Sequence, residues 1–339
     1  MMEAMNVAIA GATGAVGEAM REILEAREFP VAELHLLASE RSAGKRLQFH
    51  GKSVSVQVLD DFDFDGIQVA FFSAGGGISA DHAPRAADAG AIVIDNTSKF
   101  RMEEGIPLVV PEVNPHRIVD GLGTNIIANP NCSTIQMTVA LKPIYDAVGI
   151  ERVNVATYQA VSGAGTTGIQ ELAGQTANLL NGKPVEEFTA HPVQIAFNAV
   201  ANAWDTLDNG FTVEEMKMVQ ETRKIFEDDD LKVNPTCVRV PVFYGHCEAV
   251  HIETRDPISP ADARDLLHAA EGVVVVDDMD AACPNPVDHA AGEDPVFVGR
   301  IRQDLSHERG LNMWVVSDNV RKGAALNSVQ IAERLQELL

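Results

Sequence analysis

The sequence predicts an α/β protein whose first half forms a doubly wound, mostly parallel sheet. Apolar, strand-like runs alternate with amphipathic segments from residue 5 to about residue 130, which is the pattern of repeated β/α units. From Glu151 the pattern changes, because residues 152–160 alternate between apolar and polar side chains. That period indicates strands with one wetter face. The second half is therefore expected to be an α+β domain with a mixed, largely antiparallel sheet.

These two patterns predict two domains, and 339 residues are enough to give each a substantial core. The final segment, 326–338, has the apolar spacing of an amphipathic helix, and we expect it to pack back on the first domain. The first domain is then discontinuous. Its expected bounds are 1–130 plus 320–339, and those of the second domain are 131–319.

The composition argues against several classes of protein. The chain has 26 basic and 49 acidic residues, a formal net charge of −23, which disfavours binding to nucleic acid or to anionic membranes. No apolar run reaches membrane-spanning length, and no export signal is recognisable. The four cysteines lack CxxC spacing, so we expect no metal site and a reducing, cytoplasmic location.

A glycine-rich turn near the N-terminus predicts a dinucleotide site. The strand-like run 5–10 is followed by GATGAVG (11–17) and then by an amphipathic helix that runs to about Glu28. Glycines allow the backbone to approach a pyrophosphate, and the N-terminus of a helix supplies N–H donors to it. The alternative is a tight turn that binds no ligand. The residues expected to contact the cofactor here are Gly11, Thr13, Gly14, Ala15 and Val16.

The end of the second predicted strand, 33–38, favours NADP over NAD. An NAD site usually has an acidic residue here to bind the ribose 2′-hydroxyl. Glu40 is present, but hydroxyl and basic side chains surround it, and these suit a 2′-phosphate. The alternative is that the basic residues are solvated loop charges. The residues that carry this prediction are Ser39, Arg41 and Ser42, with Lys45 nearby.

Further predicted strands end in polar residues. A strand at 69–74 ends near Ser73, and a helix (78–89) and a strand (91–95) follow. Ligands bind at the carboxyl ends of such strands, so Ser73 is a further candidate for the cofactor. The next polar segment ends in Arg101, which could bind an anion or belong to an ordinary polar loop. Two more strand-like runs cover 107–113 and 125–129.

The second of those runs leads directly into Cys132. Residues 135–141 have the spacing of a helix, with Asn131 or Ser133 as a plausible cap, so Cys132 is expected in the first helical turn. The helix dipole lowers the pKa of a thiol there and makes it a nucleophile. An arbitrary cysteine is more often a small packed residue. The polar residues farther along the chain favour the nucleophile.

The second half supplies candidate partners for this thiol. We expect a helix at about 212–226, opened by a Thr212–Glu215 capping box. On it Glu214 and Lys217 share a face, either as an ordinary ion pair or as ligands for a charged substrate. Residues 236–255 are expected to form a hairpin that has Arg239 in mid-strand and His246 at the turn. A buried charge needs a partner or a ligand, and a histidine at a turn suits acid/base chemistry.

The second half also contains a glycine-rich turn, SGAG at 162–165, before a predicted helix at about 166–181. This turn could contact the cofactor or be only a sharp connection. Residues 183–211 are rich in proline and asparagine and are expected to be irregular, and short strands are expected at 273–276, 296–303 and 311–317.

Taken together, the motifs resemble those of the aspartate-semialdehyde dehydrogenase family, particularly its bacterial type. The motifs are GATGAVG, SKFRM, NPNCST, YQAVSGAG, EEMK, RVPVFYGH and DNVRKGAA, and they span nearly the whole chain in this order. The combination of NPNCST and RVPVFYGH is the most specific part of this resemblance. The resemblance implies a Rossmann-like cofactor domain followed by a catalytic and dimerisation domain. It also implies a reversible, NADP-dependent reaction that converts L-aspartate 4-semialdehyde and phosphate into 4-phospho-L-aspartate.

The resemblance also implies roles for individual residues. Cys132 would be the nucleophile that forms an acyl-thioester, and His246 would be the acid/base. Gln159 and Arg239 would bind the substrate, and Glu214 would meet its ammonium group, although Glu215 is an alternative. Arg101 and Lys217 would bind phosphate with help from Asn131. The further cofactor contacts implied are Ser162, Gly163 and Asn319. The family also implies a homodimer or a tetramer.

Three other functions are consistent with parts of this set. Another acyl-phosphate reductase would use the same cysteine and histidine, but Arg239 and Glu214 suit a free amino acid better. An inactive relative that acts as an interaction protein would not need both Cys132 and His246. A nucleotide-binding sensor would not need these two residues together with Gln159.

Overall fold

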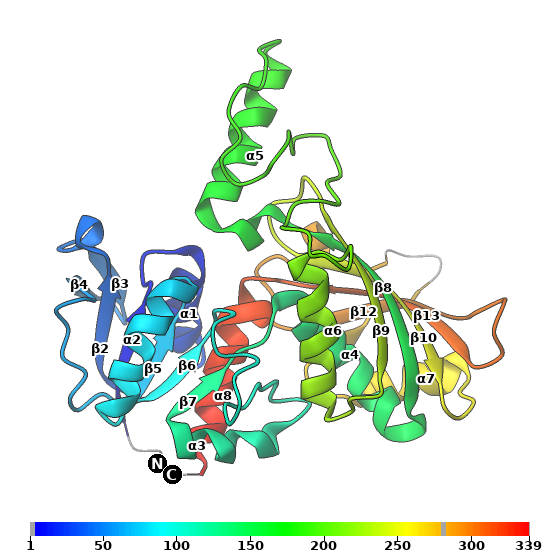
Figure 1. Ribbon diagram of the computed structural model, residues 1–339, viewed down its shortest axis with the longest axis horizontal. Coiled ribbons are helices and arrows are strands. Elements are labelled where there is room, and N and C mark those ends of the chain that lie inside the picture. Colours follow the sequence, from blue (N-terminus) through cyan, green and yellow to red (C-terminus); the bar gives the residue numbers. More distant parts are fainter. Residues whose placement is uncertain (1–3, 279–282, 339) are drawn as a thin grey trace. The chain divides into compact units, whose positions relative to one another are not determined.

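The structure is a computed structural model that describes residues 4–278 and 283–338 (Figure 1). The chain divides into two compact units. Unit 1 consists of Met1–Asn131 and Ala324–Leu339, and unit 2 consists of Cys132–Gly323. Among the described residues, no helix is both long enough and apolar enough to cross a membrane.

Unit 1 contains a seven-stranded sheet in the order β3-β4-β2-β1-β5-β6-β7. The strands are β1 (Met5–Ala10), β2 (Val31–Ala38), β3 (Arg46–Phe49), β4 (Lys52–Val58), β5 (Val69–Phe72), β6 (Ile92–Asp95) and β7 (Ile126–Ala128). All neighbouring pairs are parallel except β3 and β4, which form an antiparallel hairpin at the edge. The predicted doubly wound sheet is confirmed, and the edge hairpin is an addition to it.

The helices of unit 1 are α1 (Ala15–Ala26), α2 (Gly76–Asp88), α3 (Gly121–Thr124) and α8 (Leu326–Gln336). Two short 3-10 helices, η1 (Glu40–Ser42) and η2 (Pro115–Asp120), lie in its loops. The last helix, α8, packs against α1 and β6. Its Asn327 donates hydrogen bonds to the Val109 carbonyl and to Asn129 Oδ1, at 3.0 and 2.7 Å. These contacts fix the C-terminal helix within unit 1.

The prediction of a strand at 107–113 is wrong. Only one isolated bridge, between Leu108 and Ala128, forms in this segment. The side chain of Asn114 accepts from the Val110 N–H and donates to the Leu108 carbonyl. A side chain therefore satisfies backbone groups that a neighbouring strand would otherwise bind. The apolar residues of the segment are buried although their pairing with β7 is limited to the backbone of Ala128, and this burial gives the same sequence signal as a buried strand.

Unit 2 contains a six-stranded sheet in the order β11-β12-β13-β10-β8-β9. The strands are β8 (Ile150–Gln159), β9 (Lys232–Arg239), β10 (His246–Thr254), β11 (Val273–Val275), β12 (Val296–Gln303) and β13 (Gly310–Ser317). The pairs β8–β9 and β11–β12 are parallel, and the remaining three are antiparallel. The prediction of a mixed, largely antiparallel sheet is confirmed.

The prediction of a hairpin over residues 236–255 is wrong. β9 and β10 do not pair with each other, because β8 lies between them. Gln159 of β8 pairs with Arg239 on one side, and Tyr158 pairs with Cys247 on the other. The connection 240–245 therefore crosses the end of β8 instead of making a tight turn. As a consequence His246 is the first residue of a strand and not a turn residue.

The helices of unit 2 are α4 (Cys132–Val148), α5 (Gly165–Leu180), α6 (Val213–Phe226) and α7 (Pro260–His268). There are also short helical turns, η3 (Val161–Ala164), η4 (Pro286–Ala290) and η5 (Arg321–Ala325). The last of these, η5, runs into unit 1. Helix α4 contacts α6, α7 and the strands β8, β10, β12 and β13, so it lies across the sheet. The predicted capping box of α6 is confirmed. Thr212 Oγ1 accepts from the Glu215 N–H, and the Glu215 carboxylate accepts from the Thr212 N–H.

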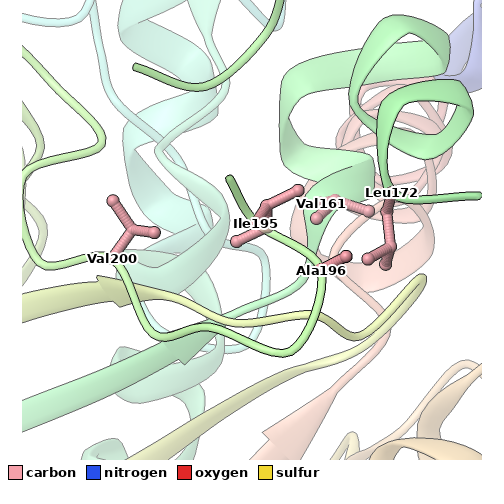
Figure 2. Packing of buried hydrophobic residues seen from close by; sticks show 5 residues of the cluster. All are labelled: Val161, Leu172, Ile195, Ala196 and Val200. Carbon is pink, nitrogen blue, oxygen red and sulfur yellow. The ribbon is translucent and has the colours of Figure 1, made fainter. Parts of the chain in front are cut away.

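The irregular segment 183–211 is anchored to α5 by a small apolar cluster (Figure 2). Val161 and Leu172 pack there with Ile195, Ala196 and Val200. Buried polar side chains of α5 support this packing, since Gln175 Oε1 accepts from the backbone N–H groups of residues 195 and 196. The predicted irregularity is confirmed, and its buried hydrogen bonds explain how a loop of this length is held.

Candidate active site

Cys132 and His246 lie in contact in unit 2. Cys132 is the first residue of α4, where the predicted position in the first turn is confirmed, and His246 is the first residue of β10. Cys132 Sγ lies 3.2 Å from His246 Nε2. The positive end of the α4 dipole favours negative charge on the sulfur. The two element ends therefore bring a thiol and an imidazole into direct contact.

His246 is fully buried. Its second ring nitrogen also takes part in a hydrogen bond. The backbone N–H of Ala160 donates to His246 Nδ1 at 3.0 Å. Burial and, to a smaller extent, the charge of Arg239 lower the pKa of His246 to about 3, and Glu214 opposes this shift. The imidazole is therefore neutral around pH 7.

Arg239 is the last residue of β9, and its side chain is almost completely buried. Its Nη1 donates to the Ala160 carbonyl at 2.7 Å, and its guanidinium carbon lies 4.7 Å from the ring centroid of Trp204. Burial lowers the pKa of Arg239, while Glu214 and Cys132 oppose that shift. An arginine remains protonated in proteins, so the site contains a desolvated, planar cation.

Gln159, Glu214 and Lys217 form a second group in unit 2. Gln159 Nε2 donates to Glu214 Oε1 at 3.1 Å, and Lys217 Nζ donates to Glu214 Oε2 at 3.0 Å. Glu215 faces elsewhere, since its carboxylate accepts from the backbone N–H groups of Thr212 and Cys237. The geometry therefore favours Glu214 over Glu215 as the residue that faces Gln159.

Ser162, Gly163 and Asn319 are also brought together in unit 2. Ser162 and Asn319 exchange hydrogen bonds through their side chains, and Asn319 Oδ1 also accepts from the Gly245 N–H at 3.0 Å. A Cβ atom at Gly163 would lie 2.7 Å from Arg239 Nη1. The absence of a side chain at Gly163 thus leaves room for the Arg239 guanidinium.

The glycine turn of unit 1 is closely packed, and two of its glycines have no room for a side chain. Gly11 has a φ of +90°, and a Cβ atom there would lie 2.9 Å from the carbonyl carbon of Ser73. A Cβ atom at Gly17 would lie 2.3 Å from the Gly11 carbonyl oxygen. Gly14 caps α1 without a side-chain hydrogen bond. These features fit a dinucleotide pyrophosphate at the helix N-terminus.

The other predicted ligands of unit 1 lie at strand ends. Ser39 caps the short helix η1, which contains Arg41 and Ser42, and Thr13 Oγ1 lies 3.4 Å from Ser42 Oγ. Arg101 is buried, and its Nη2 donates to the Asn96 carbonyl at 2.8 Å. The remaining predicted residues are Ala15 and Val16 in α1, Ser73 after β5, whose Oγ donates to the Ala10 carbonyl, and the buried Asn131.

Sequence reasoning missed several residues of the unit 2 site. Ala160 contributes only its peptide groups, so its side chain carries no signal. Trp204 is one of two tryptophans and lies in the irregular segment, which was a usable signal. A Cβ atom at Gly323 would lie 2.8 Å from Cys132 Cβ. Among the described residues, no group of three or more His, Cys, Asp or Glu side chains could hold a metal ion.

Comparison with known proteins identifies the class and then the family. Residues 6–121 match the family model described as the NAD binding domain of semialdehyde dehydrogenase, and residues 141–322 match its dimerisation domain. The chain is 62% identical over 335 residues to aspartate-semialdehyde dehydrogenase 2 of Vibrio cholerae, covering 99% of this chain and 98% of that protein. This chain belongs to the aspartate-semialdehyde dehydrogenase family.

Solved structures agree with this assignment. The crystal structure of aspartate semialdehyde dehydrogenase II from Vibrio cholerae, complexed with ASA, matches with a TM-score of 0.97 and 61% identity, covering 99% of each chain. The enzyme from Candida albicans, solved with NADP, matches with a TM-score of 0.76 and 26% identity. That match covers 99% of this chain and 100% of the other.

Replacing Gly163 with alanine tests the space that Arg239 needs. The new methyl group would displace the guanidinium, so we expect the KM for aspartate semialdehyde to rise about tenfold, or ~1.4 kcal/mol. Steady-state kinetics and NADP binding, measured by fluorescence titration, check this. Gly174→Ala in α5 is the matched control, because nothing lies within 4 Å of its added Cβ. Weaker NADP binding with an unchanged KM would assign Gly163 to the cofactor instead.

Proposed function

We propose that this chain interconverts L-aspartate 4-semialdehyde and 4-phospho-L-aspartate through an acyl-thioester on Cys132, with NADP as the hydride carrier. The observation that carries the proposal is the 3.2 Å contact between Cys132 Sγ and His246 Nε2 at the start of α4. In biosynthesis the reaction runs toward the semialdehyde. It lies on the route to lysine, methionine, threonine and diaminopimelate.

In this proposal Cys132 attacks the carbonyl carbon of the substrate. The α4 N-terminus and the Arg239 cation favour the thiolate, which is the nucleophilic form of the side chain. His246 is assigned as the acid/base, and it acts at the carbonyl oxygen, where negative charge develops when sulfur adds to the carbon. Bound NADPH or NADP supplies the hydride chemistry. Splitting the reaction into thioester formation and discharge lowers the barrier of each step.

Arg239, Glu214 and Gln159 bind the amino-acid part of the substrate. A guanidinium recognises a carboxylate through two parallel hydrogen bonds, so Arg239 is assigned to the α-carboxylate. Glu214 is assigned to the ammonium group, and Gln159, which donates to Glu214 at 3.1 Å, orients the substrate between them. A zwitterionic amino acid matches this pair of opposite charges.

Arg101 and Lys217, with Asn131, are assigned to the phosphate. The chain has a net charge of −23, so an anionic substrate must be attracted by local cations against the overall field. Burial of Arg101 supports this role, because water competes less with a phosphate at a desolvated guanidinium.

The cofactor is assigned to the glycine turn of unit 1 and to nearby strand ends. Gly11, Thr13, Gly14, Ala15 and Val16 bind the pyrophosphate. The 2′-phosphate is assigned to Ser39, Arg41 and Ser42, and further contacts to Ser73, Ser162, Gly163 and Asn319. NADP in the related Candida albicans structure supports the choice of cofactor.

The working form is proposed to be a homodimer, because residues 141–322 match a dimerisation domain. Its proposed location is the cytoplasm. Disulfides are rare in the reducing cytoplasm, and all four cysteines of the chain are free.

The direct test follows NADPH formation by absorbance with aspartate semialdehyde as substrate. The wild-type enzyme should form NADPH in a phosphate-dependent manner. Cys132→Ala should bind NADP normally but lose turnover by more than about 10³-fold, as expected for loss of a nucleophile. Phosphate-independent turnover, or appreciable activity of Cys132→Ala, would contradict the proposed reaction.

Replacing Arg101 with leucine tests the phosphate assignment. We expect the KM for phosphate to rise about 30-fold, corresponding to ~2 kcal/mol for a lost charged hydrogen bond. The KM for the semialdehyde should change much less. Arg101→Lys keeps the charge and loses the forked geometry, so its KM for phosphate should lie between those of the wild-type enzyme and Arg101→Leu. Equal effects on both substrates would argue against a phosphate role.

Replacing Arg41 with aspartate tests recognition of the 2′-phosphate. The new carboxylate should repel that group, so the ratio of kcat/KM for NADP to that for NAD should fall by about tenfold or more. Lys52→Asp, an exposed charge reversal of the same size in β4, controls for the change in net charge. An unchanged ratio would place 2′-phosphate recognition elsewhere.

A further inference from the structure

Glu248 is a fully buried acidic residue that has no role in the proposed reaction. It lies two residues after His246 on β10 and, because side chains alternate along a strand, both residues point to the same face of the sheet. Neither oxygen of its carboxyl group has a hydrogen-bond partner of good geometry among the described residues. A buried carboxylate without partners is strongly disfavoured, so this group needs either a donor or a proton.

The residues opposite Glu248 on the two neighbouring strands are uncharged. They are Thr157 of β8 and Val315 of β13. Two thiols, Cys237 on β9 and Cys247 on β10, are close enough for Glu248 to affect their titration, but burial raises the pKa of both and keeps them uncharged. A charge on Glu248 would therefore have uncharged groups as its immediate neighbours in the sheet.

The nearby charged side chains are bound to other groups. The two charged residues of α4, Lys142 and Asp146, pair with each other. Arg239, at the end of β9, donates to a backbone carbonyl at 2.7 Å. Burial raises the pKa of Glu248 well above its usual range, and a contact with the Gln136 side chain opposes this shift to a smaller extent. The carboxyl group therefore keeps its proton at neutral pH.

Gln136 of α4 is the side chain that faces Glu248. It lies one helical turn after Cys132, so these two residues share a face of α4. Gln136 is buried, its Nε2 lies 3.5 Å from the His246 carbonyl oxygen, and its Oε1 has no partner among the described residues. A neutral carboxyl group has one O–H donor, which a carboxylate lacks. A proton on Glu248 would thus supply the donor that Gln136 Oε1 needs.

We propose that Glu248 is a neutral carboxylic acid that donates to Gln136 Oε1, and that this buried pair positions His246 against Cys132. Glu248 follows His246 by two residues on one strand, and Gln136 follows Cys132 by four residues on one helix. A hydrogen bond between them ties β10 to α4 close to the contact between Sγ and Nε2. Both are positioning residues, because they act through His246 and Cys132. The inference rests on the proposed function and concerns the support of that site.

The neutral state of Glu248 also suits the chemistry of its neighbours. A buried carboxylate there would oppose formation of the Cys132 thiolate, because like charges repel strongly where water is excluded. A neutral acid supplies a hydrogen bond without adding that charge. The acid/base role of His246 is preserved, since Gln136 contacts its backbone carbonyl and not its ring.

The first test is the infrared difference spectrum between the cofactor-free wild-type enzyme and Glu248→Gln near neutral pH. The C=O stretch of a protonated carboxyl group is separate from the bands of a carboxylate, and we expect Glu248→Gln to remove the protonated band. Glu151→Gln is the matched control, because Glu151 pairs with Lys232 at the surface and its replacement should remove carboxylate bands instead. Loss of carboxylate bands in Glu248→Gln would overturn the proposal.

The second test is the pH dependence of Cys132 alkylation by iodoacetamide. Glu248→Gln replaces one neutral group with another, so the apparent pKa of Cys132 should shift by less than about half a unit. If Glu248 were a carboxylate, its removal would favour the thiolate and lower the apparent pKa of Cys132 by about one unit or more. Such a fall would contradict a neutral Glu248.

The third test measures kcat for aspartate semialdehyde in variants that remove or keep the donor. Glu248→Leu lacks the O–H, so His246 and Cys132 should be less well aligned and kcat should fall about tenfold or more, with the KM for NADP near its wild-type value. Glu248→Gln keeps an N–H donor for Gln136 Oε1 and should retain kcat within about threefold of wild type. A wild-type kcat in Glu248→Leu, or equal losses in both variants, would rule out the positioning role.

The double variant Gln136→Leu with Glu248→Leu shows whether the two residues act as a pair. If both single changes remove the same hydrogen bond, the double variant should lose no more kcat than the more damaging single variant. Losses that multiply would mean that the residues act separately, against the proposal. If a leucine variant does not fold, the infrared and alkylation tests of Glu248→Gln still decide. Those two tests use neither substrate nor turnover, so failure of this inference is distinct from failure of the proposed reaction.

Discussion

The contact between Cys132 Sγ and His246 Nε2 depends on the order of three strands in unit 2. Because β8 lies between β9 and β10, the carboxyl ends of β8 and β9 and the start of β10 lie side by side at the same end of the sheet. β8 ends at Gln159, β9 ends at Arg239, and β10 begins at His246. The Arg239 cation, the His246 imidazole and the Gln159 amide are therefore adjacent as a result of strand pairing. Helix α4 adds the thiol by beginning at Cys132 and packing across the same sheet.

The charges of this site are paired within the protein. Glu214 accepts from both Gln159 and Lys217, and Arg239 contacts the Ala160 carbonyl and the face of Trp204. Buried charges without partners are costly, and these contacts reduce that cost. The two adjacent carboxylates of α6 have different roles. Glu215 caps the helix, whereas Glu214 accepts a hydrogen bond from Gln159.

Much of this organisation was predictable from the sequence, because it depends on local patterns. The β/α alternation, the glycine turn, the Thr212–Glu215 cap and the position of Cys132 each have a signal within a few residues. The failures depend on long-range pairing or on peptide groups. Residues 236–255 have the pattern of a hairpin, and nothing local indicates that β8 inserts between the two strands. Residues 107–113 are buried like a strand, but the Asn114 side chain binds two of their backbone groups and continuous strand pairing does not form. Ala160 acts through its N–H and carbonyl, so its residue type carries no information about its role.

The central claim is that Cys132 carries the acyl group between hydride transfer and attack by phosphate. The most direct measurement is rapid-quench mass spectrometry of the enzyme after it is mixed with aspartate semialdehyde and NADP in the absence of phosphate. The account predicts an aspartyl adduct on the peptide that contains Cys132, formed together with a burst of NADPH and discharged when phosphate is added. A burst of NADPH with unmodified Cys132, or an adduct that phosphate does not discharge, would contradict it.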